Sequence, residues 1–230
     1  MSTLIEARGM SAGYRKMAVV RDVDLHVAAG EVVALIGANG AGKTTTLLTL
    51  AGELAPLAGE VHFLGARTKA PMHVRCKGGL GYVTEERSVI MEMSVADNLK
   101  LAAVQPDDAF GFFPALERCM SRKAGLCSGG EQQMLSLARA LGRHPKVLLA
   151  DELSLGLAPM IVTNLLKAVR AAADERGVGV LLVEQHVRQA LKVADRVHVM
   201  ERGHIVLSGT SEEVVGQLDR IEAAYLPGST

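Results

Sequence analysis

The chain has 230 residues, 49% of them hydrophobic, which is enough for one large domain with a buried core. Its 25 lysines and arginines balance its 25 aspartates and glutamates, and it has no Trp, so it lacks the basic groove and aromatic platforms of nucleic-acid-binding proteins. No apolar run reaches membrane-spanning length, and the N-terminus shows no signal-peptide pattern, so we expect a cytosolic protein.

The first predicted elements are strands. Apolar and polar residues alternate between Leu4 and Val27, which predicts a half-buried antiparallel strand. Residues 28–30 then turn the chain into the continuous apolar run 32–36, which precedes a glycine-rich segment and a helix that ends at Gly52. Further strands are predicted at 59–64 and 80–83.

The glycine-rich segment Gly37-Ala38-Asn39-Gly40-Ala41-Gly42-Lys43-Thr44 follows a strand and opens a helix, which is the order of a phosphate-binding P-loop. Glycine lets the backbone approach an anion closely, and the helix that starts at Lys43 adds its positive dipole end. We expect Lys43 to contact the terminal phosphates of a nucleotide and the Thr44 hydroxyl to ligate Mg²⁺. Thr45 is included in the predicted site.

A small helical lobe is predicted in the middle of the chain. It follows a polar corner at residues 84–87, and Ser94 is the predicted N-cap of a helix with Asp97 at the capping-box position. Between Gln105 and Leu126, proline and glycine interrupt short helical pieces such as 115–121. Residues 131–141 then form an amphipathic helix.

The last third of the chain indicates a βαβ sheet. Apolar runs at 147–150 and 178–183 flank a helix at 160–176, which is typical of parallel strands covered on both faces. A hairpin at 196–208 turns at Arg202-Gly203, and Thr210 with Glu213 caps a last helix. Cys76, Cys119 and Cys127 fit no metal-binding spacing, which predicts free thiols.

Two further groups carry chemistry. Asp151 and Glu152 close a buried strand at the sheet edge where ligands bind, so Asp151 is expected to hold the metal through water and Glu152 to activate the attacking water. Ser128-Gly129-Gly130 opens a helix and forms a second anion site. One nucleotide needs one such loop, so the second is expected to close over nucleotide held by another subunit.

These motifs, together with the isolated His186 after the next strand, resemble in their order the ATP-binding subunit of ABC transporters. The resemblance implies an α/β P-loop NTPase fold with a mainly parallel core sheet, an N-terminal antiparallel β subdomain and a small helical subdomain. It implies a single domain over 1–230, with a RecA-like core at 1–84 and 143–230 and a Q-loop and helical signature part at roughly 85–142. Four segments are similar to branched-chain amino-acid importer ATPases: Gly130–Met134, Ser154–Pro159, Val183–Gln185 and Ala224–Leu226.

The resemblance also implies ATP and Mg²⁺ as cofactors and assigns roles to residues. The catalytic residues would be Glu152, His186 and Lys43. Nucleotide would be bound by Tyr14, Gly37, Ala38, Asn39, Gly40, Ala41, Gly42, Lys43, Thr44 and Thr45, and by Ser128, Gly129, Gly130 and Gln132. The metal ligands would be Thr44, Asp151 and Glu85. Tyr14 would stack on adenine, the alternative being a partly buried strand tyrosine, and His186 would contact the γ-phosphate.

The chain departs from the family pattern at several positions. Cys127 replaces the usual Leu, and Leu153 replaces the usual Pro. Thr84-Glu85 stands where the family normally has Gln, or in this subgroup often Pro-Glu, and the Glu85 carboxylate adds a negative charge beside the phosphates, which bears on coupling. The helical lobe is also short. Its phenylalanines (Phe110, Phe112 and Phe113) either line the groove that docks a membrane subunit or pack in the core of the lobe.

The sequence thus predicts the ATPase subunit of an importer, for branched-chain or other hydrophobic amino acids or for related amides or urea. Its expected partners are a second ABC ATPase, the same or different, two permeases and an external solute-binding protein, without nucleic acid. Its expected place is the cytoplasmic face of the cell membrane. Two alternatives stay open: a weakly hydrolysing regulatory subunit, suggested by Glu85 and Cys127, and a soluble ABC ATPase that does not transport.

Overall fold

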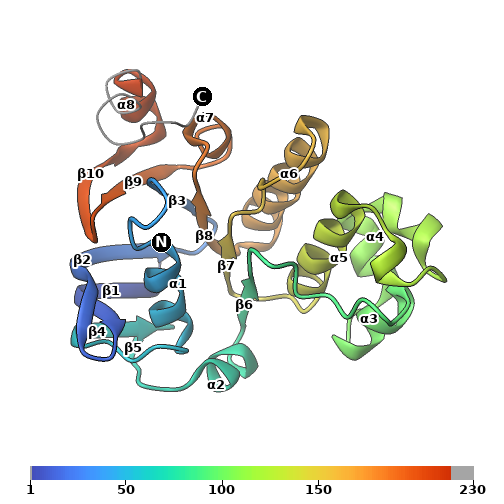
Figure 1. Cartoon of the computed structure of the whole chain (residues 1–230), viewed down its shortest axis with the longest axis horizontal. Helices are drawn as coiled ribbons and strands as arrows, with labels where there is room; N and C mark the ends of the chain where they lie inside the picture. Colours follow the sequence, from blue (N-terminus) through green and yellow to red (C-terminus); the bar gives the residue numbers. More distant parts are fainter. Residues whose placement is uncertain (1, 219–230) are drawn as a thin grey trace.

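The structure, a computed structural model, describes residues 2–218 of the chain. Within these residues the strands form two sheets, with a group of helices on one side (Figure 1). The four-stranded sheet has the order β2-β1-β4-β5, and the six-stranded sheet has the order β10-β9-β3-β8-β7-β6. The predicted family-like ending Ala224–Leu226 lies outside the described residues.

The four-stranded sheet is antiparallel throughout. Its strands are β1 (Thr3–Tyr14), β2 (Met17–Ala28), β4 (Ala58–Phe63) and β5 (Ala66–Arg67). The prediction of one strand between Leu4 and Val27 was wrong, because the segment folds back on itself. Arg15 and Lys16 make the turn with φ of 48° and 66°, the left-handed backbone that suits a two-residue hairpin. Neither residue is Gly or Asn, so the usual turn signal was missing.

The six-stranded sheet confirms the predicted parallel core. β3 (Val32–Ile36), β8 (Gly179–Glu184), β7 (Val147–Asp151) and β6 (Leu80–Val83) run parallel, and β9 (Arg196–Glu201) is parallel to β3. β10 (His204–Thr210) pairs antiparallel with β9 at the edge. Every residue of β3, β7 and β8 is buried, as their continuous apolar runs predict.

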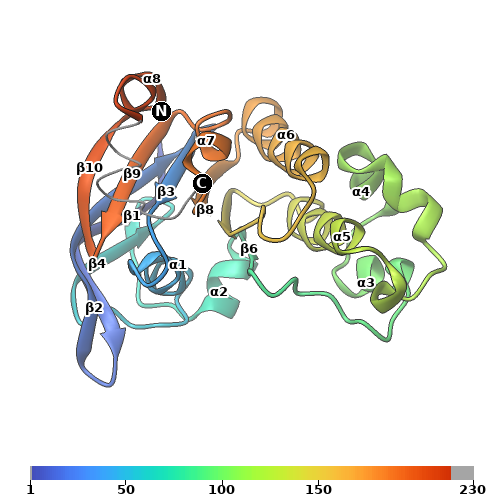
Figure 2. The same ribbon diagram turned by 45° about the horizontal axis from the view of Figure 1, so that its top comes forward.

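Two hydrophobic cores cover the two faces of this sheet. On one face, α1 (Lys43–Ala51) packs between the two sheets through Leu47 and Leu50. On the other face, α5 (Gly129–Leu141) and α6 (Pro159–Arg176) pack against alternate residues of the same strands. Figure 2 shows these two helices side by side. The shorter helices are α2 (Met72–Lys77), α7 (Val187–Ala190) and α8 (Ser211–Val215). Thr210 and Glu213 form the predicted capping box of α8.

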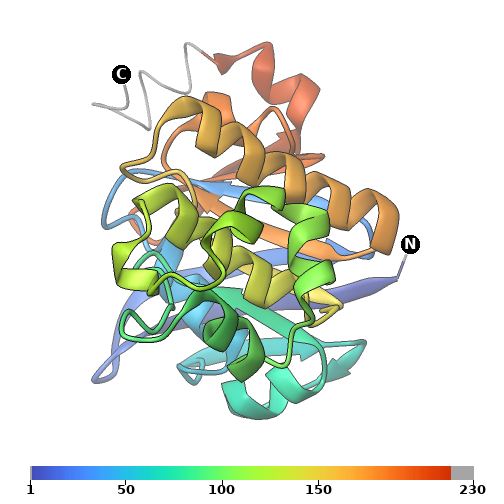
Figure 3. The ribbon, with the colours of Figure 1, turned by 90° about the vertical axis from the view of Figure 1, so that its right-hand side faces the viewer.

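The helical lobe extends from the β6 edge of the sheet and faces the viewer in Figure 3. It contains α3 (Val95–Leu101), α4 (Pro106–Phe112), the 3₁₀ helices η1 (Pro114–Cys119) and η2 (Ala124–Leu126), and α5. Ser94 caps α3 as predicted, because its hydroxyl accepts the Asp97 N–H at 3.0 Å. The predicted helix at 115–121 is instead η1, since so short a connector favours the tighter i→i+3 pattern.

The phenylalanines of the lobe belong to its packing. Phe113 is 2% exposed, and Phe110 and Phe112 pack against the same hydrophobic core. A groove of about 900 Å³ lies between the lobe and the sheets, bordered by Tyr82, Thr84 and Arg139 among others, and the three phenylalanines are not part of its lining. Phe112 and Phe113 also line a separate cavity of about 340 Å³ beside α6, so both alternatives for the phenylalanines stay open.

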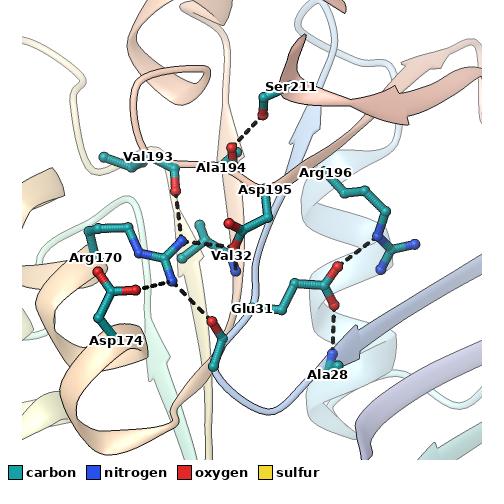
Figure 4. A network of polar contacts seen from close by, with 11 residues as sticks. Ala28, Glu31, Val32, Arg170, Asp174, Val193, Ala194, Asp195, Arg196 and Ser211 are labelled. Carbon is teal, nitrogen blue, oxygen red and sulfur yellow. Dashed lines mark hydrogen bonds and ion pairs between the residues drawn. The ribbon is translucent and has the colours of Figure 1, made fainter. Parts of the chain in front are cut away.

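A polar network fixes the start of β3, at the end of the sheet opposite the glycine-rich loop (Figure 4). Arg170 on α6 donates to the Asp195 carboxylate at 2.8 Å and to the Gly30 carbonyl at 3.0 Å. Arg196 on β9 donates to Glu31 at 2.7 Å. These bonds join three segments and so hold the strand that leads into the loop.

No helix among residues 2–218 combines the length and the apolar character that crossing a membrane requires.

Candidate nucleotide site

The P-loop (residues 37–44) is shaped by glycine. Gly42 has φ of 110°, a left-handed value that L side chains rarely adopt. A Cβ on Gly37 would lie 2.4 Å from the Met200 carbonyl oxygen, so only glycine fits against β9 there. The loop is thereby tightly folded between the end of β3 and the start of α1, where the helix presents its positive dipole end.

Lys43 is held inside the P-loop. Its Nζ donates to the Gly37 carbonyl at 2.8 Å and to the Ala38 carbonyl at 3.2 Å. The same Nζ lies 3.5 Å from Glu152 Oε1, and Lys43 is only 4% exposed. The ammonium therefore stands where a phosphate in the loop and the carboxylate at the end of β7 can both reach it.

A cavity of about 410 Å³ joins the P-loop to the ends of the neighbouring strands. Eight predicted site residues line it, together with three residues without a predicted role (Val19, Leu155 and Gln185), whereas Gly37 and Asp151 are not part of the lining. The eight are Asn39, Gly40, Gly42, Lys43, Thr44, Thr45, Glu85 and Glu152. The structure thus brings Glu85 and Glu152 to the loop from β6 and β7, because parallel strands end at one edge of the sheet.

Asp151 has the properties of a metal ligand. It is 2% exposed, and its Oδ1 has no hydrogen-bond partner among the described residues. Burial raises the pKa of Asp151 to about 6, although a hydrogen bond from Thr44 counteracts the rise. A buried carboxylate oxygen without a partner favours a nearby cation, and the oxygen donors of Thr44, Asp151 and Glu85 are those that Mg²⁺ prefers. The residues present therefore fit the metal.

Glu152 is fixed from two sides. Gln185 Nε2 donates to its Oε2 at 2.5 Å, while Oε1 faces Lys43. Its own N–H donates to the Val183 carbonyl at 3.0 Å, and its φ of 48° bends the chain at the end of β7. Sequence reasoning assigned no role to Gln185. No signal in the sequence could have assigned it, because only the sheet makes β8 the parallel neighbour of β7 and brings the ends of both strands to one edge.

Other predicted residues lie outside the cavity. Tyr14, at the end of β1, is 48% exposed, and His186, which precedes α7, is exposed. Neither belongs to the lining of the P-loop cavity. Ala38 contributes its carbonyl to Lys43, and Ala41 is buried. The roles of Tyr14 and His186 stay predictions.

The second glycine loop, the SGG loop (residues 128–130), starts α5 and is built by a capping box. The Ser128 hydroxyl accepts the Glu131 N–H at 3.2 Å, and Glu131 Oε2 accepts the Ser128 N–H at 2.7 Å. Gln132 Nε2 donates to the Ala124 and Cys127 carbonyls at 3.0 and 3.2 Å. Ser128, Gly129, Gly130 and Gln132 do not line the P-loop cavity of their own chain.

Arg87 connects the polar corner after β6 to this loop. Its Nη1 donates to Gln132 Oε1 at 3.3 Å, and a Cβ on Gly129 would lie 2.9 Å from the same nitrogen. Sequence reasoning assigned no role to Arg87, because residues 87 and 129 meet only in the folded lobe.

Comparison with known proteins decides the family. The sequence profile that describes ABC transporters matches residues 20–154. The chain is also 39% identical, over 95% of its length and 97% of the relative's, to the high-affinity branched-chain amino acid transport ATP-binding protein BraG of Pseudomonas aeruginosa. This chain belongs to the ABC transporter family.

Other ABC relatives are named for other functions. The lipopolysaccharide export system ATP-binding protein LptB of Acidithiobacillus ferridurans is 37% identical, with coverage of 94% of this chain and 93% of the relative. Among solved structures, the ATP-binding subunit of an ABC transporter matches with a TM-score of 0.80 at 28% identity, over 97% and 96% of the two chains. An ABC cassette in its ADP conformation matches in fold, with a TM-score of 0.84 at 24% identity and 94% coverage of both chains.

Family membership confirms the predicted ABC fold and the predicted enzyme class. This ABC subunit is an ATP-hydrolysing enzyme, and its cofactors are ATP and Mg²⁺.

Proposed function

We propose that this ABC ATPase drives the uptake of branched-chain or other hydrophobic amino acids, with related amides and urea as the nearest alternatives. BraG supports this proposal, and so does the probable branched-chain amino acid transport ATP-binding protein LivF of Archaeoglobus fulgidus, which is 34% identical over 90% of this chain. Export of a lipid-linked molecule is the second candidate, because LptB is 37% identical.

The observation that carries the catalytic proposal is the position of Glu152 between Lys43 and Gln185. Lys43 exchanges the loop carbonyls for the phosphates, and Glu152, oriented by Gln185, accepts a proton from the attacking water. Thr44, Asp151 and Glu85 would hold Mg²⁺, which when bound neutralises charge on the phosphate oxygens. Tyr14 stacking on adenine and His186 contacting the γ-phosphate complete the proposed site.

The working unit in this proposal is a head-to-tail dimer, with either an identical or a sister ATPase. The SGG loop starts a helix and does not line its own chain's nucleotide cavity, so it is free to complete the site of a facing subunit. A dimeric ABC cassette whose fold matches this chain with a TM-score of 0.81 supports the arrangement. Two permeases and an external solute-binding protein complete the importer, with this subunit on the cytoplasmic face of the membrane.

The same proposal assigns different roles to two parts of the chain. Residues 1–84 and 143–230 form the core that holds nucleotide, and roughly 85–142 form the part that carries the SGG loop and docks on the permease. Closure of the dimer on ATP and its reopening after hydrolysis would then move the permeases between two states.

Replacing the proposed base tests the catalytic role. Glu152→Gln should retain ATP binding and trap the dimer, while turnover falls about 10²-fold or more, because the amide cannot accept the water's proton. Mg-ATP hydrolysis and nucleotide affinity are measured together. Glu86→Gln, which changes an exposed carboxylate after β6, is the matched control and should hydrolyse normally. Unchanged turnover in Glu152→Gln would remove Glu152 from this role.

Reconstitution tests the substrate and the alternatives. In proteoliposomes with its permeases, the ATPase should be stimulated by a leucine-loaded solute-binding protein. Stimulation by lipopolysaccharide, and not by the loaded binding protein, would favour export. A chain that hydrolyses ATP only slowly, both alone and with a sister ATPase, would indicate a regulatory subunit.

A further inference from the structure

Folding of the lobe brings together two thiols and a carboxylate. Their spacing along the sequence matches no metal-binding motif. Cys119 ends η1, Cys127 follows η2, and Glu131 lies in the first turn of α5. One ligand atom from each, two sulfurs and a carboxylate oxygen, all lie within 4.8 Å of one another. Cys119 Sγ donates to Glu131 Oε1 at 3.0 Å.

Burial and neighbouring groups give the cluster a closed side and an open side. Cys119 and Cys127 are 2% and 8% exposed, whereas the Glu131 side chain is 24% exposed. The Ser128 N–H donates to Glu131 Oε2 at 2.7 Å, and Arg122 Nη1 lies 3.7 Å from the same oxygen. The carboxylate is thus oriented from outside the cluster, while its Oε1 points at the thiols.

We propose that Cys119, Cys127 and Glu131 form a binding site for a thiophilic divalent cation, Zn²⁺ above all. Zinc takes cysteine sulfur and carboxylate oxygen in tetrahedral geometry, in which ligand atoms lie roughly 3.5–4 Å apart. Only a modest closing of the cluster is needed to reach that spacing. A water entering past the exposed side of Glu131 would fill the fourth position, and the two thiol protons would be released on binding.

The protonation of the cluster argues against a reactive thiol pair. Burial, and then the hydrogen bond and the negative charge of Glu131, raise the pKa of Cys119 to about 11, and burial also raises the pKa of Cys127. Such thiols are weak nucleophiles. A divalent cation would have to displace both thiol protons; once bound it stabilises the thiolates and uses the carboxylate that a disulfide would leave without a role. Arg122 would balance the remaining negative charge.

The position of the site links it to the SGG loop. Glu131 is the residue whose carboxylate caps the Ser128 N–H, and a cation on Oε1 leaves that bond on Oε2 in place. Bound metal would therefore tie η1 to the start of α5 and restrict the loop. This inference needs neither the proposed substrate nor the proposed dimer.

Cobalt titration tests the proposal, since tetrahedral Co²⁺ bound by thiolate absorbs strongly. The probe is Co²⁺ added to the reduced full-length chain without an affinity tag. We expect thiolate-to-cobalt charge-transfer bands that saturate at one Co²⁺ per chain and disappear when Zn²⁺ is added. Wild-type protein without these bands overturns the proposal, and this result does not depend on any variant folding.

Variants locate the site. Cys119→Ser and Cys127→Ser should each weaken or abolish the charge-transfer bands, while Cys76→Ser, which changes the cysteine of α2, should keep them. Glu131→Gln should weaken Co²⁺ binding, and Glu117→Gln, an exposed acid in η1, should not. Full bands in a double Cys119→Ser, Cys127→Ser chain would place the metal elsewhere and overturn the proposal.

Discussion

At the end of β8, Glu184 is a carboxylate buried to 1% exposure, and it accepts the N–H of Ser154 at 3.2 Å and its hydroxyl at 2.6 Å. Burial raises the pKa of Glu184 to about 7, although these hydrogen bonds oppose the rise. Glu184 precedes Gln185, the residue that orients Glu152. The negative charges of Glu152 and Asp151 also raise the pKa of Glu184, so its charge state is coupled to the site carboxylates as well as to the stability of the chain.

Glu184→Gln should make stability less dependent on pH. Because the folded-state pKa of Glu184 lies above its ordinary value of 4.5, the native chain holds a proton that the unfolded chain has lost, and stability falls as pH rises from about 4.5 to about 7. The neutral amide avoids this loss, which is on the order of 1–3 kcal/mol. Urea unfolding at pH 5 and pH 8 measures it. Equal losses in wild type and variant would contradict the assignment.

Single residues of the site were predictable when their role depends on close neighbours. Lys43 and Thr44 follow glycines in a contiguous loop, and Asp151 and Glu152 close one apolar run, so their positions at the sheet edge could be inferred. Gln185 could not be assigned, because its bond to Glu152 joins two strands whose relative register only the sheet sets.

At the scale of elements, α2 supports α1 through one buried side chain. Arg75 donates to the carbonyls of Thr49 and Leu50, in the last turn of α1, at 3.3 and 2.5 Å, and to the Ala70 carbonyl at 2.8 Å. Carbonyls at a helix C-terminus lack partners within the helix, and a cation there also interacts well with the helix dipole. Arg75 thus anchors α1, the helix that starts at the end of the P-loop.

Arg75→Met should destabilise the chain by about 2–4 kcal/mol, because buried carbonyls lose charge-assisted hydrogen bonds while the apolar stem is kept. Denaturant unfolding gives the value. Lys77→Met, on the exposed side of the same helix, is the matched control and should change stability by less than about 0.5 kcal/mol. A similar small effect in both variants would show that Arg75 does not anchor α1.

Elements with long, clear patterns were predicted well, and short ones were not. β7, β8 and α6 are where their apolar patterns put them, since burial on both faces or on one stripe sets those patterns. The helix α2 was not predicted, and the short helical piece predicted at 115–121 is the 3₁₀ helix η1, one residue earlier at its start and two shorter at its end. In such short pieces tertiary contacts outweigh intrinsic propensity.

At the scale of the whole molecule, the two glycine loops that are predicted to bind anions lie in different parts of the fold. The P-loop starts α1 between the two sheets, and the SGG loop starts α5 in the lobe. The two loops do not line one cavity within the chain, which is the physical basis of the proposed dimer.

Gly129→Asp, placed in the Glu152→Gln background, should prevent ATP-dependent dimerisation, because a carboxylate at the SGG loop repels phosphate. Light scattering with Mg-ATP gives the mass, and nucleotide binding by the chain's own P-loop should persist. Gly111→Asp, in α4 of the same lobe with open space at its Cβ, should still dimerise. A dimer of the Gly129→Asp chain would argue against the proposed closure.

The sequence by itself determined the features that neighbouring residues create: the P-loop, the buried strands with Asp151 and Glu152 at an end, and the capped SGG helix. Local chemistry and periodicity suffice for these. Only the tertiary structure decided that Gln185 holds Glu152, that Arg75 anchors α1, and that Cys119 and Cys127 meet Glu131. Each of these joins segments whose distance depends on how helices and strands pack, which spacing along the chain does not encode.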